Sequence, residues 1–475
     1  MTKLAYRRWL SGVGCIVGVS CSTSRAPLPV LSPVPEALED ISFRAKVPLP
    51  QEEPSFEIPV LQSEVWENGL RFTQIVRPLQ RNPVLVLLFA SLSSSDLVDR
   101  VVIEGFAQRV IDALPSGSIV RTFEAAGGLG LVLDLLPDDL DKGLSILADA
   151  LTKPVSNKQM SRARKKLMRA RSRASRSELV DTILHRERYG AGHPWGKDAI
   201  QQVRALAELK SKELVAATRE RLWPGATYLV YSGSLGVWSR QDTRRFRSWS
   251  SNTYSKPERV VIPAARRKGD LRFHLFRTTS DRSSLYVMHV GPGVLDSDYG
   301  AFSALCLLLG GILSEAGREF RVEGGSSYGV HTSLVGRREA TECQWYGTFK
   351  PGELARAVEQ HMAQLDGLRR GEIDGRSLAV ARGRVTSRGL RLFADPAHMA
   401  KWVATQRALG RSTTDIVQRW RFVPDLSDEA LRRVAESTFH PPHLDFVAVY
   451  GALRDYYALS ARGADIHYRV DTTDE

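Results

Sequence analysis

The first 184 residues of this chain contain no histidine, although ten histidines follow from His185 onward. A zinc site built on two histidines one helical turn apart, with a neighbouring glutamate as base, is therefore excluded from that stretch. None of the later histidines restores such a pattern. The run between Asp149 and Glu178 also has no acidic residue, so it offers no carboxylate to a metal ion.

Cysteine is scarce, with four residues in 475. Two of them, Cys306 and Cys343, lie in apolar surroundings in the second half of the chain. Buried thiols are the default interpretation of such cysteines. A single disulfide between them is left open, because cysteine count alone cannot establish a bridge.

Long apolar runs are absent, and the short run from Trp9 to Ser20 is too short to span a bilayer as a helix. Basic residues precede it, as in a signal peptide over residues 1–20. Val19-Ser20-Cys21-Ser22 then resembles a bacterial lipobox, although Gly18 stands where the pattern prefers leucine. We predict lipidation at Cys21, which would anchor the protein to a membrane of the bacterial cell envelope, on the periplasmic side. Lipidation at Cys15, plain secretion and an uncleaved anchor stay open.

The chain is strongly basic, with a formal charge of +13 and a pI near 9.7. Such a charge favours acidic partners or anionic surfaces. The sequence has no zinc finger, RNP-type run or basic-region heptad, so we predict no nucleic-acid partner.

The order of the predicted strands and helices indicates a fold of the α+β class with an internal duplication. Two β-branched and aromatic strands, Ala226–Tyr231 and Leu444–Tyr450, close halves of similar length, and each is followed by a glycine. Helical periodicity predicts one helix over Lys158–Leu184 and another over Leu206–Leu222. The predicted segments are a Pro-rich tether (21–60), an N-terminal repeat (61–235), a linker (236–270), a C-terminal repeat (271–452) and a tail (453–475).

A family resemblance rests on several short motifs in order. The pitrilysin/insulinase zinc peptidases, the inverzincins, carry a Gly-x-Ala-His-x-x-Glu-His pattern. Its position is taken here by the similar segment Gly105-Phe106-Ala107-Gln108-Arg109-Val110-Ile111-Asp112. Further matches are Glu67-Asn68-Gly69-Leu70-Arg71, Phe123-Glu124-Ala125-Ala126-Gly127-Gly128, Leu135-Leu136-Pro137-Asp138-Asp139-Leu140, Ala191-Gly192-His193-Pro194-Trp195-Gly196, Leu308-Leu309-Gly310-Gly311 and Phe320–Gly329. The chain after the tether resembles the short two-repeat form of this family. The resemblance implies two homologous α/β repeats, each a mostly antiparallel sheet covered by helices, forming half of a clamshell.

The resemblance also implies that the zinc site has been lost. Gln108 and Asp112 stand at the two histidine positions, and Ile111 stands at the position of the general base. The third ligand of the family is a glutamate on a later helix, here within about 158–177, where no acidic residue occurs. That helix instead carries a basic stripe, read as a solvated face or as a surface for an acidic partner. We therefore predict no metal bound by this chain.

A second pair of family positions is intact. Arg321 and Tyr328 stand where the resemblance places an arginine and a tyrosine that reach the substrate carbonyl beside the zinc. A guanidinium and a phenol can donate hydrogen bonds to an oxyanion without titrating near neutral pH. An ordinary surface arginine and a packed tyrosine are the alternative interpretation.

These expectations favour a non-catalytic subunit of a heterodimeric envelope metallopeptidase. A catalytic pitrilysin/insulinase-type partner would supply zinc and base, and this chain would bind peptide or unfolded polypeptide and contribute Arg321 and Tyr328. A non-enzymatic scaffold or peptide-binding protein of the same fold is the alternative. A third possibility is an atypical metallopeptidase that uses Gln108 and Asp112, although glutamine is a poor zinc ligand.

Overall fold

The computed structural model describes residues 59–115, 117–172, 176–234, 240–250, 271–311, 314–320, 325, 327–421 and 426–468. The predicted signal peptide, Cys21 and nearly all of the tether lie outside these residues. The described residues all belong to one compact unit within Glu52–Glu475. Over the described residues, no helix combines the length and apolar character needed to cross a membrane.

The first repeat contains a six-stranded sheet in the order β1-β2-β6-β3-β5-β4. Its strands are β1 (Leu61–Val65), β2 (Arg71–Val76), β3 (Val84–Phe89), β4 (Ile119–Ala125), β5 (Gly128–Asp134) and β6 (Thr227–Gly233). Every residue of β3 is buried, as expected for an apolar central strand covered on both faces. Strands β2 and β6 are parallel, and the other neighbours are antiparallel.

The second repeat contains a sheet of the same design, in the order β12-β7-β11-β8-β10-β9. Its strands are β7 (Arg272–Arg277), β8 (Ser283–Pro292), β9 (Ser327–Gly336), β10 (Ala340–Phe349), β11 (Asp445–Tyr450) and β12 (Ala464–Tyr468). Five positions match the first sheet in order and direction, which confirms the predicted duplication. The sixth differs, because β12 comes from the end of the repeat and is parallel to β7, whereas β1 precedes β2 and is antiparallel to it.

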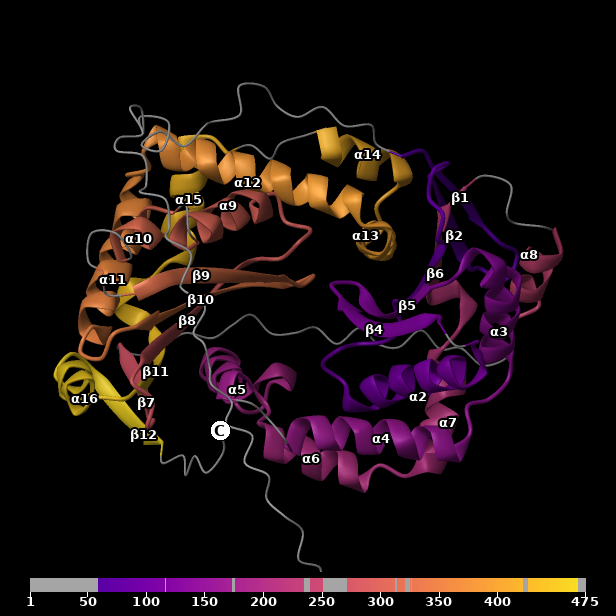
Figure 1. The fold of residues 1–475 in the computed structure, drawn as a ribbon, viewed down its shortest axis with the longest axis horizontal. Coiled ribbons are helices and arrows are strands. Elements are labelled where there is room, and N and C mark those ends of the chain that lie inside the picture. The colour runs from indigo at the N-terminus through magenta and orange to yellow at the C-terminus, as the bar shows by residue number, and fades with distance from the viewer. Residues whose placement is uncertain are drawn as a thin grey trace, which may run out of the picture. The chain divides into compact units, whose positions relative to one another are not determined.

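Helices of each repeat cover its own sheet and also reach the other one (Figure 1). The first repeat has α2 (Leu97–Ala113), α3 (Leu140–Thr152), α4 (Asn157–Ser172), α5 (Arg176–Tyr189), α6 (Ala199–Glu208), α7 (Ser211–Arg221) and, after β6, α8 (Arg240–Arg247). The second has α9 (Tyr299–Leu309), α10 (Glu315–Arg318), α11 (Leu354–Arg370), α12 (Gly375–Ala394), α13 (Pro396–Ala408), α14 (Thr413–Arg421), α15 (Asp428–Thr438) and α16 (Leu453–Ser460). In each repeat one face of the sheet packs on local helices, α2 and α3 in the first and α9, α11 and α15 in the second.

The opposite face of each sheet is covered by a helix from the other repeat. Apolar residues of α13, among them Val403, pack on the first sheet against Val86 and Val230. Apolar residues of α5, among them Ile183, pack on the second sheet against Val447. The repeats therefore share their cores, and neither sheet is complete without a helix from the other half.

The predicted elements are largely present, with three differences. The single helix expected over Lys158–Leu184 is two helices, α4 and α5, and Leu206–Leu222 falls across α6 and α7. The expected linker contains α8, and Phe246 of this helix and Trp249 just after it belong to the core of the first repeat. The expected tail contains α16 and the edge strand β12, so the second repeat continues to Tyr468.

Cys306 of α9 and Cys343 of β10 form a disulfide inside the core of the second repeat. Sequence analysis favoured buried thiols and left the bridge open. Burial is confirmed, and the bridge ties α9 directly to the sheet that it covers.

Candidate functional site

Helix α2 carries the altered zinc motif on the side that faces away from the sheet. It begins at Leu97 because the side chain of Asp96 accepts a hydrogen bond from the backbone N–H of Val98 at 2.8 Å. Phe106 and Val110 are buried toward the core. Gln108 and Asp112, one turn apart, bond to each other, with Gln108 Nε2 donating to Asp112 Oδ1 at 2.8 Å. The two groups thus satisfy one another instead of converging on a third atom.

Helix α4 completes a set of polar contacts along α2, which we name the α2–α4 ladder. Asp112 accepts a hydrogen bond from Gln159 Nε2 at 3.3 Å and forms an ion pair with Arg162 at 3.6 Å. Further along, Lys166 Nζ lies 2.6 Å from Glu104 Oε2. The helices are antiparallel here, so Glu104 and Asp112 of α2 each meet a basic residue of α4.

The helices approach closely because α2 has a glycine at the contact. A Cβ at position 105 would lie 2.6 Å from the sulfur of the fully buried Met160, so a side chain there would displace the Met160 thioether. Gly105 therefore lets Met160 of α4 pack directly on α2.

The ladder does not fit a zinc ion. Zinc in proteins needs three or four donors from cysteine, histidine or carboxylate groups around one point. Asp112 is already bound by an amide and a guanidinium, Glu104 lies two turns away beside Lys166, and α4 has no acidic residue. Ile111, 45% exposed, cannot accept a proton from a metal-bound water. The substitutions expected from the sequence are therefore accommodated as a helix–helix contact.

One group of potential metal ligands occurs elsewhere among the described residues: Glu187, His274 and Asp445. Their ligand atoms lie within 4.8 Å of one another. The guanidinium of Arg272 is bound to this group, 3.0 Å from Glu187 Oε2 and 2.8 Å from Asp445 Oδ1. A cation must displace Arg272 to bind both carboxylates, so we interpret the group as an ion-pair cluster.

A buried carboxylate, Glu342 of β10, lies at the contact of the two repeats and bonds to side chains of both. Glu342 is 4% exposed and accepts hydrogen bonds from Tyr189 Oη at 2.9 Å and from Arg337 Nη2 at 3.2 Å. His185 Nε2 lies 3.2 Å from Glu342 Oε2, the oxygen that also accepts from Arg337 Nη2. Burial raises the pKa of Glu342, but bonds and charges from His185 and Arg337 outweigh it, and the pKa falls to about 2.

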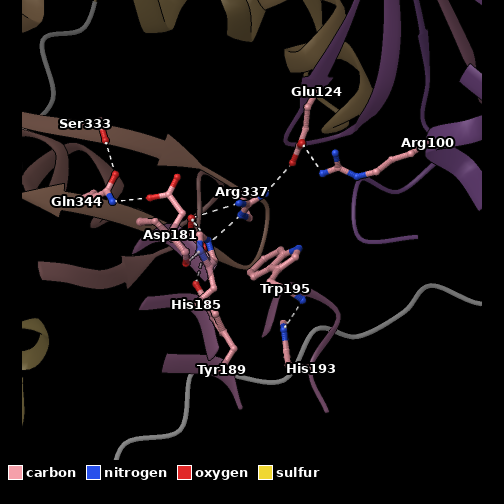
Figure 2. Close-up of polar contacts among 11 residues, drawn as sticks. Arg100, Glu124, Asp181, His185, Tyr189, His193, Trp195, Ser333, Arg337 and Gln344 are labelled. Carbon is pink, nitrogen blue, oxygen red and sulfur yellow. Dashed lines mark hydrogen bonds and ion pairs between the residues drawn. The ribbon is translucent and has the colours of Figure 1, made fainter. Parts of the chain in front are cut away.

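Arg337 extends this cluster into a chain of alternating charges. Its Nη1 lies 2.7 Å from Glu124 of β4, and Glu124 lies 3.2 Å from Arg100 of α2 (Figure 2). The guanidinium also stacks on Trp195, 4.2 Å from the ring centroid. The charges thus run from the second sheet to the helix that carries the altered motif.

The cluster is suited to holding the repeats together rather than to proton transfer. A carboxylate with a pKa of about 2 is a poor general base near neutral pH. Sequence analysis missed Glu342 and Arg337, because residues 337–342 carry no motif and their hydrogen-bonding partners in the first repeat are more than 150 positions away. A charged residue at a buried position of an alternating strand was the only local signal.

The structure does not test the expected pairing of Arg321 and Tyr328. Arg321 lies outside the described residues, and Tyr328 is described only as a backbone position in β9, between Ser327 and Gly329. Their proposed role stays a prediction.

Solved structures of the M16 peptidase type resemble this chain in fold. An M16 peptidase inactive domain from Pseudomonas fluorescens matches with a TM-score of 0.69 and 14% identity, over 82% of this chain and 98% of its own. An M16-like peptidase from Alicyclobacillus acidocaldarius matches with a TM-score of 0.68 and 14% identity, over 84% and 100%. A chain of complex III2 from Candida albicans matches with a TM-score of 0.65 and 12% identity, over 83% and 97%.

No family model matches the sequence, and neither does any curated protein. Likeness at these identities establishes the architecture, and the expected α+β class with two homologous repeats is confirmed. The chain has the fold of M16 peptidases of the pitrilysin/insulinase type, one of which is itself described as an inactive domain.

Proposed function

We propose that this protein is the non-catalytic subunit of a heteromeric metallopeptidase in the bacterial cell envelope. A partner chain with an intact zinc motif would supply the metal and the general base. This chain would bind peptide or unfolded polypeptide and contribute Arg321 and Tyr328 to the partner's site. A lipid on Cys21 would hold the complex at the membrane, on the periplasmic side.

The α2–α4 ladder is the observation that carries this proposal. The two repeats, their shared cores and the strand that bears Tyr328 are all kept, while Gln108 and Asp112, at the two histidine positions of the motif, belong to the ladder. If the fold no longer had a function, we would not expect both repeats and their shared cores to be kept. The match to an inactive M16 domain supports the same interpretation.

The disulfide supports the proposed location. Disulfides persist in oxidising compartments such as the bacterial periplasm and are rare in the cytosol. The Cys306–Cys343 bridge is therefore compatible with export of the chain.

The test is a pull-down of the full chain from its native envelope, followed by identification of bound proteins. We expect a partner of the same fold with an intact His-x-x-Glu-His motif, in a stable complex. A Cys21→Ala chain should recover the same partner from the soluble periplasmic fraction. Absence of any such partner from both preparations would contradict the proposal.

A scaffold function is the second candidate, favoured by the likeness to a chain of complex III2. A scaffold would also be found in a complex, but its partners would lack a zinc peptidase motif. The gene neighbourhood offers a rapid check, because an adjacent reading frame with an intact motif favours the peptidase.

An atypical metallopeptidase is opposed by the ladder, since Gln108 and Asp112 already bond to each other. Metal analysis of the isolated chain decides this point. Stoichiometric zinc would overturn the assignment of a lost site.

A further inference from the structure

Positive charge is concentrated in two helices at equivalent positions of the two repeats. α4 carries seven basic residues and α12 carries five, and neither has an acidic residue, in a chain of net charge +13. α4 packs on α2, and α12 packs on α9 (Figure 1). The twelve basic residues of these two helices nearly equal the net charge of the whole chain.

The outward face of α4 is a row of cations, Lys158, Arg162, Lys165 and Arg169, which we name the α4 stripe. All four are exposed, whereas Met160 and Ala163 on the other side of the helix are buried. Intervals of four, three and four residues bring the stripe to one face, with neighbouring cations about 4.5–6 Å apart along the helix axis.

Most of this charge is not neutralised within the protein. Arg162 is paired with Asp112 of α2 at 3.6 Å. Over the described part of the chain, no carboxylate forms an ion pair with Lys158, Lys165 or Arg169. Four exposed cations so close together repel one another, and an anionic ligand relieves that repulsion.

We propose that the α4 stripe binds an acidic polypeptide in extended conformation. This inference rests on the proposed function and names the class of peptide that the subunit receives. Alternate residues of an extended chain project to one side about 6.6–7 Å apart. Acidic residues at every second position would therefore follow the stripe, and Arg162 links it to the altered motif on α2.

The composition of the stripe favours a polypeptide over a membrane or a nucleic acid. Surfaces that bind bilayers place large apolar side chains among the cations so that they enter the interface, but the large apolar residues of α4, Met160, Leu167 and Met168, pack against the protein. Single-stranded nucleic acids are held by aromatic side chains between the cations, and α4 has no aromatic residue.

The test measures binding of fluorescent 12-residue peptides to the full chain by anisotropy at low salt. The probe alternates glutamate with threonine, a second peptide has glutamine in place of glutamate, and a third has the same glutamates clustered at one end. We expect the alternating acidic peptide to bind most tightly, with affinity falling steeply as salt rises.

Two triple variants separate the stripe from total charge. Lys158→Glu/Lys165→Glu/Arg169→Glu should weaken binding roughly tenfold or more, since each exposed ion pair contributes about twofold to fivefold. Arg81→Glu/Lys142→Glu/Lys350→Glu changes the net charge equally at exposed positions elsewhere and should bind nearly as the native chain does. Circular dichroism establishes that both variants fold.

Several outcomes would overturn the inference. Equal loss in both variants would mean that only net charge matters, and equal binding of the glutamine peptide would remove the charge argument. Stripe-dependent binding to phosphatidylglycerol vesicles or duplex DNA, without binding of the peptide, would assign the stripe to that ligand instead. The assay needs neither partner nor turnover, so its failure is distinct from failure of the proposed function.

Discussion

Helices α2 and α9 occupy equivalent positions in the two repeats and differ in what surrounds them. α9 is apolar over most of its length, and its Cys306 is bonded to the sheet. α2 keeps a polar side that is partly open to solvent and is held by ion pairs to α4. A helix that only covers a sheet can be built like α9. Retention of a polar face on α2 fits the proposal that this chain has lost the metal site and kept the surface around it.

The two repeats also differ in how they contribute to their shared contact. The second supplies the buried carboxylate Glu342 and the basic Arg337, and the first supplies His185, Tyr189 and Glu124. Substitutions that separate these contributions test the comparison directly.

The largest expected effect on stability is at Glu342. Glu342→Ala leaves Arg337 buried without its main partner and should cost about 3–5 kcal/mol of unfolding free energy. Glu124→Ala removes the more exposed partner of the same arginine and should cost under about 1 kcal/mol. Urea denaturation followed by circular dichroism measures both, and similar losses would show that Glu342 is not the centre of the contact.

The next largest effect concerns turnover, and it compares substitutions in the second repeat with one in the first. Removing one donor to an oxyanion lowers turnover by about 10²–10³-fold in well-studied cases. We expect Arg321→Ala or Tyr328→Phe to act on the complex in this way while assembly, followed by size-exclusion chromatography, is unchanged. Gln108→Ala on α2 should leave turnover unaltered. Loss of turnover in Gln108→Ala, with no effect of Arg321→Ala or Tyr328→Phe, would contradict the assignment of the substrate contacts to the second repeat.

Removal of the disulfide should weaken the second repeat alone. Cys306→Ala/Cys343→Ala is expected to lose about 2–4 kcal/mol of stability. Hydrogen exchange should quicken in α9 and β10 and stay slow in α2 and β3. A reductant should reproduce the loss in the native chain and have no effect on the variant, and a loss spread over both sheets would contradict a local role.

We also expect the second repeat to lose stability in acid, because its core holds His289 and His361, whose ring nitrogens lie 3.1 Å apart. Burial lowers the pKa of His361 to about 3. The unfolded chain, with a histidine pKa near 6.5, takes up the proton first, so stability falls as pH drops below about 6.5, by up to ~1.4 kcal/mol per pH unit. Thermal unfolding between pH 7 and pH 5 should show this slope.

His361→Gln should flatten that slope, whereas His398→Gln, at an exposed position, should not. His185 acts in the opposite sense. Burial would lower its pKa, but Glu342 raises it, so its contribution is present in acid and is lost as pH rises through that raised value. An unchanged slope in His361→Gln would assign the acid loss to other groups.

Much of the fold could be predicted from local pattern, and the contacts between the repeats could not. The strands β6 and β11 follow from their β-branched and aromatic runs and from the glycines after them. α13 was missed because its apolar residues do not gather on one face, as it is packed between the repeats. The ladder combines residues of two helices about 50 positions apart, so the sequence indicated that a zinc site was lost but not what replaced it.

The most direct measurement of the central claim is peptidase activity, with and without a zinc chelator, of the isolated chain and of the complex recovered from the envelope. The account predicts a silent isolated chain and a complex whose activity the chelator abolishes. Chelator-sensitive activity of the isolated chain would contradict the lost zinc site. A complex without activity would contradict the proposed role of the chain as a subunit of a peptidase.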